Sequence, residues 1–464
     1  MTELHELTAG QASAAIARRR VTAVDLVEHL LERIERLEPT LKAWETVDRK
    51  GALAAARRAD AAIRRGGANG RLHGVPVGLK DIYYTAGLRT SMSSKVFRDF
   101  VPEYDCAFVE RLRQAGAIVV GKTVTTEFAT GDPSRTVNPW EPTRTPGGSS
   151  SGSAVAVAAL EVPVASGSQT AGSVVRPAAY NGVVGFKPTY GLVSRFGVFP
   201  CSWTLDTLGW MCRSVADVAI VLDAVAGYDP RDPASVDAGP PGSFDAVFDG
   251  DKVRPPRLGL VVGYFGQKAS LEMNAATLEA VEALKLAGAS VEPFELPDSF
   301  DGIHEAQLAI DYSECSQAHR ETFARHAGDY APNIRGRIEA GALIPAAAYL
   351  QAQRLRRLFR RDMDDALSGY DAIVMPSTPA TAGDTSTTGD PMFQSPWTVA
   401  GLPEITLPTR LDSAGLPMGI QLVAAGFDDA RLLRAAQWVE ARLPGDCGTP
   451  PLAEGRTGQR LRPP

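Results

Sequence analysis

A glycine- and serine-rich stretch within this 464-residue chain restricts how the chain can fold. Residues 146–188 read PGGSSSGSAVAVAALEVPVASGSQTAGSVVRPAAYNGVVGFKP. A flexible linker needs no apolar segments, yet SAVAVAAL predicts a small-residue helix and VPVAS predicts a short buried strand. The turns GGSSSG and SQTAGS therefore lie at the two ends of a helix–strand unit. This stretch predicts a folded core and not a connection between domains.

The turn at residues 170–173, TAGS, predicts an oxyanion hole beside a nucleophile. Its small side chains leave successive backbone N–H groups open, so several donors can point at one oxygen. Ser173 at the end of the turn is then placed as a nucleophile. Because the helix–strand unit folds back on itself, Ser149 in the first turn can meet Ser173, although 24 residues separate them.

A nucleophilic serine needs a base, and no histidine lies in this stretch. The sequence also lacks a G-x-S-x-G turn that is followed by an Asp and a His. Lys80 is the alternative, because it ends the apolar, glycine-rich segment GVPVGLKDI and burial favours a neutral amine. The neighbouring Asp81 leaves open a plainer interpretation, in which Lys80 forms a surface ion pair.

The segment GAIVVGKT, Gly116 to Thr123, matches the phosphate-binding pattern G-x-x-x-x-G-K-[ST] letter for letter. Such a loop needs a strand before its first glycine, a flexible turn between the glycines and a helix after the lysine. Here Asp105 is expected to cap a helix, Gly116 to end it in the left-handed conformation, and AIVVG to form a buried strand. The order is helix, cap, strand, so we do not expect a nucleotide site.

The rest of the chain alternates helical and strand-like segments. Residues 7–66 are predicted to be helical, with Thr22 as the N-cap of AVDLVEHLLERIERLE. RLGLVVGYF, NAATLEAVEALKLAG and ASVEPFEL predict a strand–helix–strand unit of a parallel sheet. Residues 303–369 are predicted to be helical. YDAIVMPSTP, EITLPT and GIQLVAA predict further buried strands, and DDARLLRAAQWVEARL predicts a closing helix.

Composition and charge narrow the class of protein. Lys plus Arg (48) against Asp plus Glu (54) gives a net charge of −6, so no basic excess points to a nucleic-acid partner. Five scattered cysteines without CxxC spacing are typical of reduced thiols in the cytoplasm. The six histidines form no HExxH or Cys/His cluster, so we expect no metal. MTELHELTAG lacks the apolar run of a signal, and no segment is long enough to cross a membrane.

The run from Gly147 to Pro188 resembles the amidase signature family, with a GGSS-type turn, G-[ST]-x-T-x-G-S, R-P-A and N-G-V-V-G-[FL]-K-P-T. The similarity extends to GVPVGLKD, YGLVSRFGVFPCSWTLDTLG, PWTVAGLPEITLPT and GLPMGIQLVAAGFDDARLL, and so covers nearly the whole chain in order. It implies an α/β fold in which a single large domain, residues 1–464, holds a mixed twisted β-sheet covered by helices on both faces. Within it we expect a helical segment (1–66), a signature core (70–225), an exposed excursion (226–256) and a remainder (257–464).

The resemblance also implies roles for individual residues. Ser173 matches the nucleophile, Ser149 the bridging serine that a cis peptide bond holds in the family, and Lys80 the terminal base. The backbone amides of Thr170, Ala171, Gly172 and Ser173 match the oxyanion hole. The implied activity is hydrolysis of the C–N bond of a small carboxylic amide, or of a urea- or hydrazide-type compound, through an acyl-serine intermediate without a cofactor.

The signature departs from the commonest family pattern at Gln169 and Ala171, and a third position, Arg176, bears on the substrate. Gln169 and Ala171 stand in GSQTAGS where many members have GTDTGGS, and Ala171 is compatible with the turn only if its φ is not positive. The arrangement around Arg176, GSVVRPA, resembles that of members that act on carboxylate-bearing amides. Arg176 would then anchor a substrate anion, and Gln169 is a second candidate substrate contact. The structural alternative is that Arg176 binds loop carbonyls before Pro177.

Other functions remain open from the sequence. The main alternative is the glutaminase-type A subunit of a tRNA-dependent amidotransferase, which belongs to the same family but works in a complex. The Gln169 and Arg176 combination argues against it. A catalytically dead binding module is not expected, because Ser173, Ser149 and Lys80 are all present. The expected partner is a small amide, and a homodimer is left open.

Overall fold

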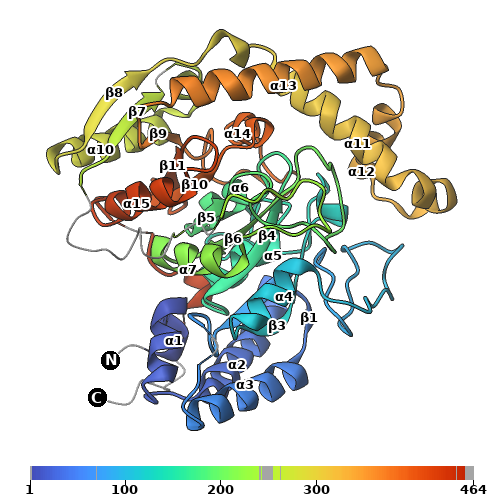
Figure 1. Cartoon of the computed structure of the whole chain (residues 1–464), viewed down its shortest axis with the longest axis vertical. Helices are drawn as coiled ribbons and strands as arrows, with labels where there is room; N and C mark the ends of the chain where they lie inside the picture. The colour runs from blue at the N-terminus through green and yellow to red at the C-terminus, as the bar shows by residue number, and fades with distance from the viewer. Residues whose placement is uncertain are drawn as a thin grey trace.

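The computed structural model describes residues 3–68, 70–239, 242, 254–261, 263–445 and 447–454. In these residues eleven strands form one sheet in the order β1-β3-β2-β4-β6-β5-β10-β11-β9-β7-β8 (Figure 1). The strands are β1 (Trp44–Val47), β2 (Pro76–Lys80), β3 (Ile118–Thr123), β4 (Val164–Gln169), β5 (Val184–Lys187), β6 (Thr207–Cys212), β7 (Arg257–Val261), β8 (Ser290–Phe294), β9 (Ala372–Pro376), β10 (Glu404–Leu411) and β11 (Pro417–Val423).

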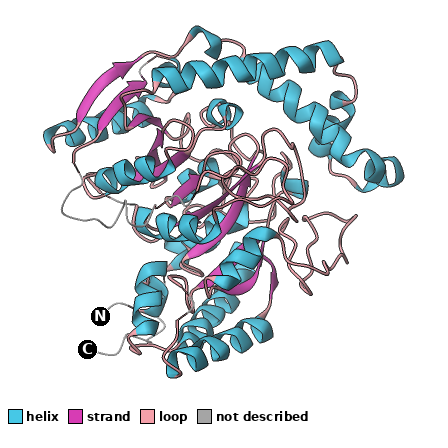
Figure 2. Cartoon of the chain, viewed as in Figure 1, coloured by secondary structure: helices cyan, strands magenta, loops and turns pink. Residues whose placement is uncertain are grey.

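The sheet is mixed, as predicted. β2 is parallel to both β3 and β4, and β7 is parallel to both β8 and β9, whereas β4, β5, β6, β10 and β11 pair antiparallel with one another along the centre. Helices flank the sheet on both faces (Figure 2). The single α/β domain with a covered mixed sheet is therefore confirmed.

The helices follow the periodic segments of the sequence closely. Thr22 caps α2 as expected, since its hydroxyl accepts a hydrogen bond from Asp25 N at 3.0 Å. The principal helices are α1 (Ala9–Ala17), α2 (Ala23–Leu41), α3 (Arg49–Arg64), α4 (Ala107–Gln114), α5 (Ser151–Ala158), α6 (Val175–Asn181), α7 (Val215–Val225), α9 (Tyr264–Lys268), α10 (Leu271–Leu286), α11 (Ile303–His326), α12 (Pro332–Gly341), α13 (Ala346–Ala366), α14 (Ser395–Ala400) and α15 (Asp429–Glu440).

Two local predictions were wrong. Strand β1 interrupts the segment 7–66 that we predicted as helical, because it pairs with the outer edge of β3. Cys106 and not Asp105 is the N-cap of α4; the Asp105 carboxylate instead accepts a hydrogen bond from Ala86 N at 2.8 Å. Both differences come from contacts between segments that are distant in sequence.

The nucleotide-like segment has the predicted structure. Helix α4 ends before Gly116, whose φ of 85° is left-handed, and the residues between the two glycines run into strand β3. Lys122 is buried and donates to the Tyr83 carbonyl and to Thr90 Oγ1, so its amine is engaged inside the protein. This order of elements does not form a phosphate-binding loop.

The remaining predictions about organisation are tested only in part. The predicted excursion 226–256 is described only at residues 226–239, 242 and 254–256, and its remaining residues lie outside the described ones. The other boundaries within the domain stay predictions. Among the described helices none is long and apolar enough to cross a membrane. The described side chains also contain no group of three or more His, Cys, Asp or Glu that could hold a metal ion.

Candidate active site

Pairing of β2 with β4 brings Lys80 to the glycine- and serine-rich unit. Lys80 is the last residue of β2, and its Nζ donates to Ser149 Oγ at 2.7 Å. Its Nζ also donates to Ser168 Oγ at 2.9 Å, and its backbone N–H donates to Ser166 Oγ at 2.9 Å. The surface ion pair with Asp81 is thus not what the structure shows, since Lys80 and Asp81 are both fully buried and Asp81 lies 3.9 Å from Lys122 instead.

Burial changes the proton affinity of this amine. It lowers the pKa of Lys80 to about 7, against the smaller raising effects of Asp206 and Cys201. Burial also raises the pKa of Asp206 to about 6, although its carboxylate accepts hydrogen bonds from Thr170 Oγ1 at 2.6 Å and from Cys201 N at 2.8 Å. A neutral Lys80 is therefore accessible near neutral pH.

The first turn of the unit holds Ser149 through its backbone. The Gly148–Ser149 peptide bond is cis, as the family resemblance implies. The guanidinium of Arg176 donates to Gly148 O at 2.7 Å and to Gly389 O at 2.7 Å. Arg176 is 5% exposed, and its hydrogen-bond partners are loop groups, so its geometry favours the structural interpretation; its role as a substrate anchor stays a prediction.

Ser173 lies at the second turn, directly after β4, and is 9% exposed. The two turns meet, because Ser150 N donates to Ser173 O at 3.4 Å. No direct hydrogen bond joins the hydroxyls of Ser149 and Ser173, both of which belong to the described part of the chain. In ligand-free sites such hydrogen bonds are often long and shorten only when substrate is bound.

The backbone amides of the second turn are free to bind an anion. Within the described residues, the N–H groups of Ala171, Gly172 and Ser173 donate to no other protein group. Ala171 is not among the residues with a positive φ, so the alanine is compatible with the turn. A Cβ at Gly172 would lie 2.8 Å from Gln394 Oε1, so a larger residue there would require Gln394 to move.

The buried side chain of Gln169 binds the backbone that directly follows this turn. Its Oε1 accepts hydrogen bonds from Val174 N at 2.9 Å and from Val175 N at 3.1 Å, directly after the serine. Its Nε2 donates to Thr398 Oγ1 at 3.0 Å and to the carboxylate of Glu404. Gln169 is fully buried, and both ends of its amide bind protein groups, which leaves no free polar atom for a substrate.

Thr398 and Glu404 belong to this network although the sequence interpretation did not include them. Thr398 Oγ1 donates to Ala171 O at 2.8 Å, so it holds the 170–173 turn directly. Burial raises the pKa of Glu404 to about 8, partly offset by Lys187 and by Gln169. A carboxylate at the start of the apolar strand EITLPT is the signal that sequence reasoning could have used.

The turn borders a small opening toward solvent. A cavity of about 190 Å³ is lined in part by Ser168, Thr170, Cys201 and Asp206, with Trp203 at its edge, 45% exposed. Thr170 belongs to the second turn, and Ser168 Oγ is the group that accepts a hydrogen bond from Lys80 Nζ. The cavity therefore reaches the edge of the candidate site at Ser168 and Thr170.

The fold around this buried lysine is that of amidohydrolases, enzymes that cleave carbon–nitrogen bonds. The family model described as Amidase matches residues 25–433. The chain therefore belongs to the amidase family, and it is a hydrolase of the amidase signature type.

Relatives and solved structures agree over nearly the whole length. The A subunit of glutamyl-tRNA(Gln) amidotransferase from Roseiflexus sp. (strain RS-1) is 38% identical, over 94% of this chain and 96% of its own. A protein from a vestigial complex that bears on the origins of an s-triazine catabolic enzyme has a TM-score of 0.88 at 30% identity, over 95% of this chain and 100% of its own. Native peptide amidase from Stenotrophomonas maltophilia has a TM-score of 0.82 at 31% identity, over 96% and 98%.

Proposed function

We propose that the chain hydrolyses the C–N bond of a small carboxylic amide, or of a related urea- or hydrazide-type compound, through an acyl-Ser173 intermediate. The observation that carries this proposal is the 2.7 Å hydrogen bond from the buried amine of Lys80 to Ser149, beside a turn with three unengaged amides. Burial lowers the pKa of this amine to about 7, so that a large fraction of it is neutral at neutral pH, as a base requires.

In the proposed reaction, neutral Lys80 accepts a proton from Ser149, and Ser149 accepts one from Ser173. The Ser173 oxygen forms a bond to the amide carbon, and the carbonyl oxygen takes the negative charge. The N–H groups of the 170–173 turn donate to that oxygen, and each such donor is worth roughly 3–4 kcal/mol in other enzymes.

The tetrahedral intermediate then breaks its C–N bond. The proton held on Lys80 returns through Ser149 to the leaving nitrogen, which departs as ammonia or an amine. Water is activated by the same relay, adds to the acyl carbon and releases the carboxylic acid with Ser173 regenerated. Water is the one co-reactant, and the protons taken up by Lys80 are returned in each half of the cycle.

A second candidate is the glutaminase-type A subunit of a tRNA-dependent amidotransferase. The 38% identity to such a protein, over nearly the full length of both chains, supports this candidate better than it supports a free-standing amidase. The chemistry at Ser173 is shared, because a glutaminase also releases ammonia from a carboxamide. The candidates differ in substrate and in the need for partner subunits. A cytoplasmic location remains a prediction for either.

A substrate panel tests the function and separates the two candidates. Ammonia release is measured for the chain alone with aliphatic, aromatic and carboxylate-bearing amides, and with glutamine. We expect saturable release from at least one small amide. Release from glutamine that rises strongly when co-purified partner chains are added would identify the amidotransferase component. No release from any amide, with or without partners, contradicts the proposed hydrolysis.

The Gln169 network predicts a loss of turnover when its hydrogen bonds are removed. Gln169→Leu leaves the Val174 and Val175 amides, directly after the 170–173 turn, and the Glu404 carboxylate without this partner. We therefore expect kcat to fall roughly a hundredfold, as for loss of one oxyanion donor. The free energy of unfolding should fall by about 2–4 kcal/mol, since buried polar groups are left unpaired. Steady-state kinetics and denaturant titration measure the two effects.

Gln421→Leu is the matched control for this variant. Gln421 is also fully buried, and its Nε2 donates to Phe393 O at 2.7 Å and not to a residue of the 170–173 turn. This variant should lose stability and retain kcat within a few-fold. If Gln169→Leu lost stability but kept its kcat, Gln169 would support the fold without positioning the turn.

A further inference from the structure

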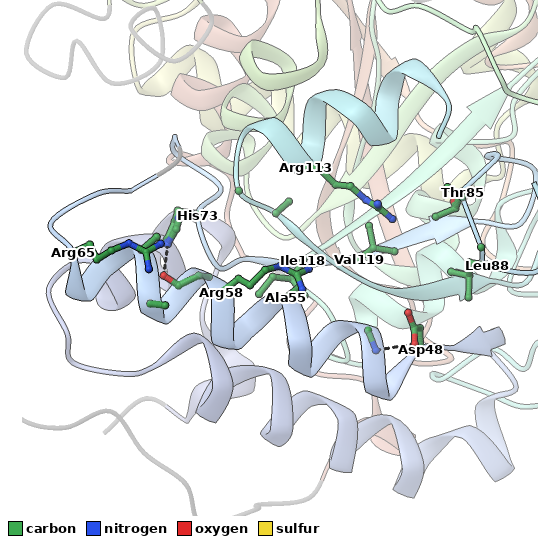
Figure 3. A pocket seen from close by; sticks show the side chains of 18 residues that line it. Asp48, Ala55, Arg58, Arg65, His73, Thr85, Leu88, Arg113, Ile118 and Val119 are labelled. Atoms are coloured by element: carbon green, nitrogen blue, oxygen red, sulfur yellow. Dashed lines mark hydrogen bonds between the residues drawn. The ribbon is translucent and has the colours of Figure 1, made fainter. Parts of the chain in front are cut away.

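A second cavity, of about 580 Å³, lies between α3, α4 and the beginning of β3 (Figure 3). Ile118 and Val119 form part of its wall and pair with Pro76 and Val77 of β2. Lys80 lies three residues beyond Val77, at the opposite end of that strand, roughly 10 Å away at 3.3 Å per residue. The cavity is therefore separate from the proposed active site.

Small residues on α3 create this space. Gly51, Ala55, Ala59 and Ala62 all line the cavity, and their spacing of four, four and three residues places them on one face of the helix. None of these side chains is large enough to close the gap to α4. With Ile118, Val119 and Leu88 they give the cavity an apolar floor and wall.

Three arginines surround this apolar floor. Arg58 of α3 and Arg65, the C-cap of α3, are seven residues apart and so lie on the same side of the helix, and Arg113 faces them from α4 (Figure 3). Arg58 and Arg65 form no ion pair and no side-chain hydrogen bond with any described residue. Arg113 is paired with Asp105 at 3.0 Å.

The other polar groups of the cavity do not balance this charge. Asp48 is the one carboxylate among the residues that line it, and its Oδ1 accepts the Gly51 N–H at 2.9 Å as the cap of α3. His73 Nε2 is hydrogen-bonded to Ala59 O at 3.0 Å. Two guanidinium groups are therefore available to a ligand.

We propose that this cavity binds a small organic phosphate with two or more negative charges on its phosphate groups. Guanidinium groups bind phosphate through paired, charge-assisted hydrogen bonds. Arg58 and Arg65 are about 10 Å apart along the helix axis, at 1.5 Å per residue, which a nucleotide-sized compound spans. The apolar floor contacts the organic part of the ligand, and the volume is in the range of small-molecule sites.

Calorimetry with the full chain tests this assignment, with adenosine diphosphate, inorganic pyrophosphate and citrate as probes. We expect saturable binding of adenosine diphosphate, weaker binding of pyrophosphate because it lacks the apolar part, and weaker binding still of citrate. In Arg58→Glu/Arg65→Glu the affinity for adenosine diphosphate should fall at least about a hundredfold, or roughly tenfold for each lost charge-assisted contact.

Arg57→Glu/Arg64→Glu is the matched control. It makes the same change of charge on exposed arginines of the same helix that do not line the cavity, and it should bind adenosine diphosphate within a few-fold of the original chain. Circular dichroism verifies that both variants are folded. Three results would overturn the proposal: no saturable binding of any probe, equal weakening in both variants, or citrate binding as tightly as adenosine diphosphate.

Discussion

Replacing Ser173 by alanine should reduce ammonia release from an accepted amide by roughly 10⁴- to 10⁶-fold, the range seen when a nucleophilic serine is removed from a serine hydrolase. The side chain supplies the oxygen that bonds to the acyl carbon, and no neighbouring group stands in its place. The remaining activity would come from the turn amides and from substrate binding alone. Single-turnover kinetics on the panel substrate measures the loss.

The same pair of proteins, the original chain and Ser173→Ala, also tests for the covalent intermediate. With the original chain, rapid acid quenching followed by mass spectrometry should show an acyl adduct on the peptide that contains Ser173, and Ser173→Ala should show none. Ser151→Ala is the matched control, since Ser151 is buried in the same unit and its hydroxyl has no hydrogen-bond partner among the described residues. Turnover within about twofold is expected there, because no satisfied hydrogen bond is lost. Activity retained by Ser173→Ala would remove the basis of the proposed reaction.

Strong local patterns predicted most of the helices and strands. The period of α2, the Thr22 cap and the valine-rich strand β3 are properties of contiguous residues, and the structure reproduces each of them. Strand β1 was missed because its four residues lie between two helices and form a strand only by pairing with β3, which lies more than 70 residues later. Local sequence carries no information about that pairing.

The candidate site likewise has features that local sequence predicted and features that it did not. The shape of the TAGS turn and the position of Ser173 followed from the residues themselves. The apolar segment made Lys80 a candidate base, but its link to Ser149 came from the family resemblance, because that contact spans 69 residues and requires β2 to lie beside β4. Burial at that position could be expected from GVPVGLK, but the partner of the amine could not.

Long-range polar contacts account for what the sequence did not predict. Gln169 reaches Glu404 across 235 positions, and Arg176 reaches Gly389 across 213. Each contact joins a residue of the 146–188 stretch to a segment more than 200 positions later. The sequence therefore suggested substrate contacts for both side chains, whereas the geometry gives both of them partners within the protein.

Replacing Lys80 by methionine should lower kcat/KM by at least about a thousandfold, because the relay then has no base. In the original chain the base must be neutral. With its pKa lowered to about 7 by burial, the neutral fraction falls as pH falls below 7, so kcat/KM should drop about tenfold per pH unit there and level off above it. A pH–rate profile between pH 5 and 9 measures the limb, and Lys80→Arg should not restore activity because a guanidinium stays protonated.

The pH dependence of the free energy of unfolding independently tests the lowered pKa of Lys80. The pKa of Lys80 is lower in the folded chain than the roughly 10.4 of an unfolded lysine, so between about pH 7 and 10 the unfolded chain binds a proton that the folded chain does not. The free energy of unfolding should therefore rise with pH across this window, and the slope should be smaller in Lys80→Met. Lys187→Met is the matched control: burial also lowers the pKa of Lys187, to about 8, but its amine donates to Pro188 O and Leu402 O and not to Ser149. That variant should lose stability yet keep the rate limb near pH 7. A limb that persisted in Lys80→Met would show that another group is the base.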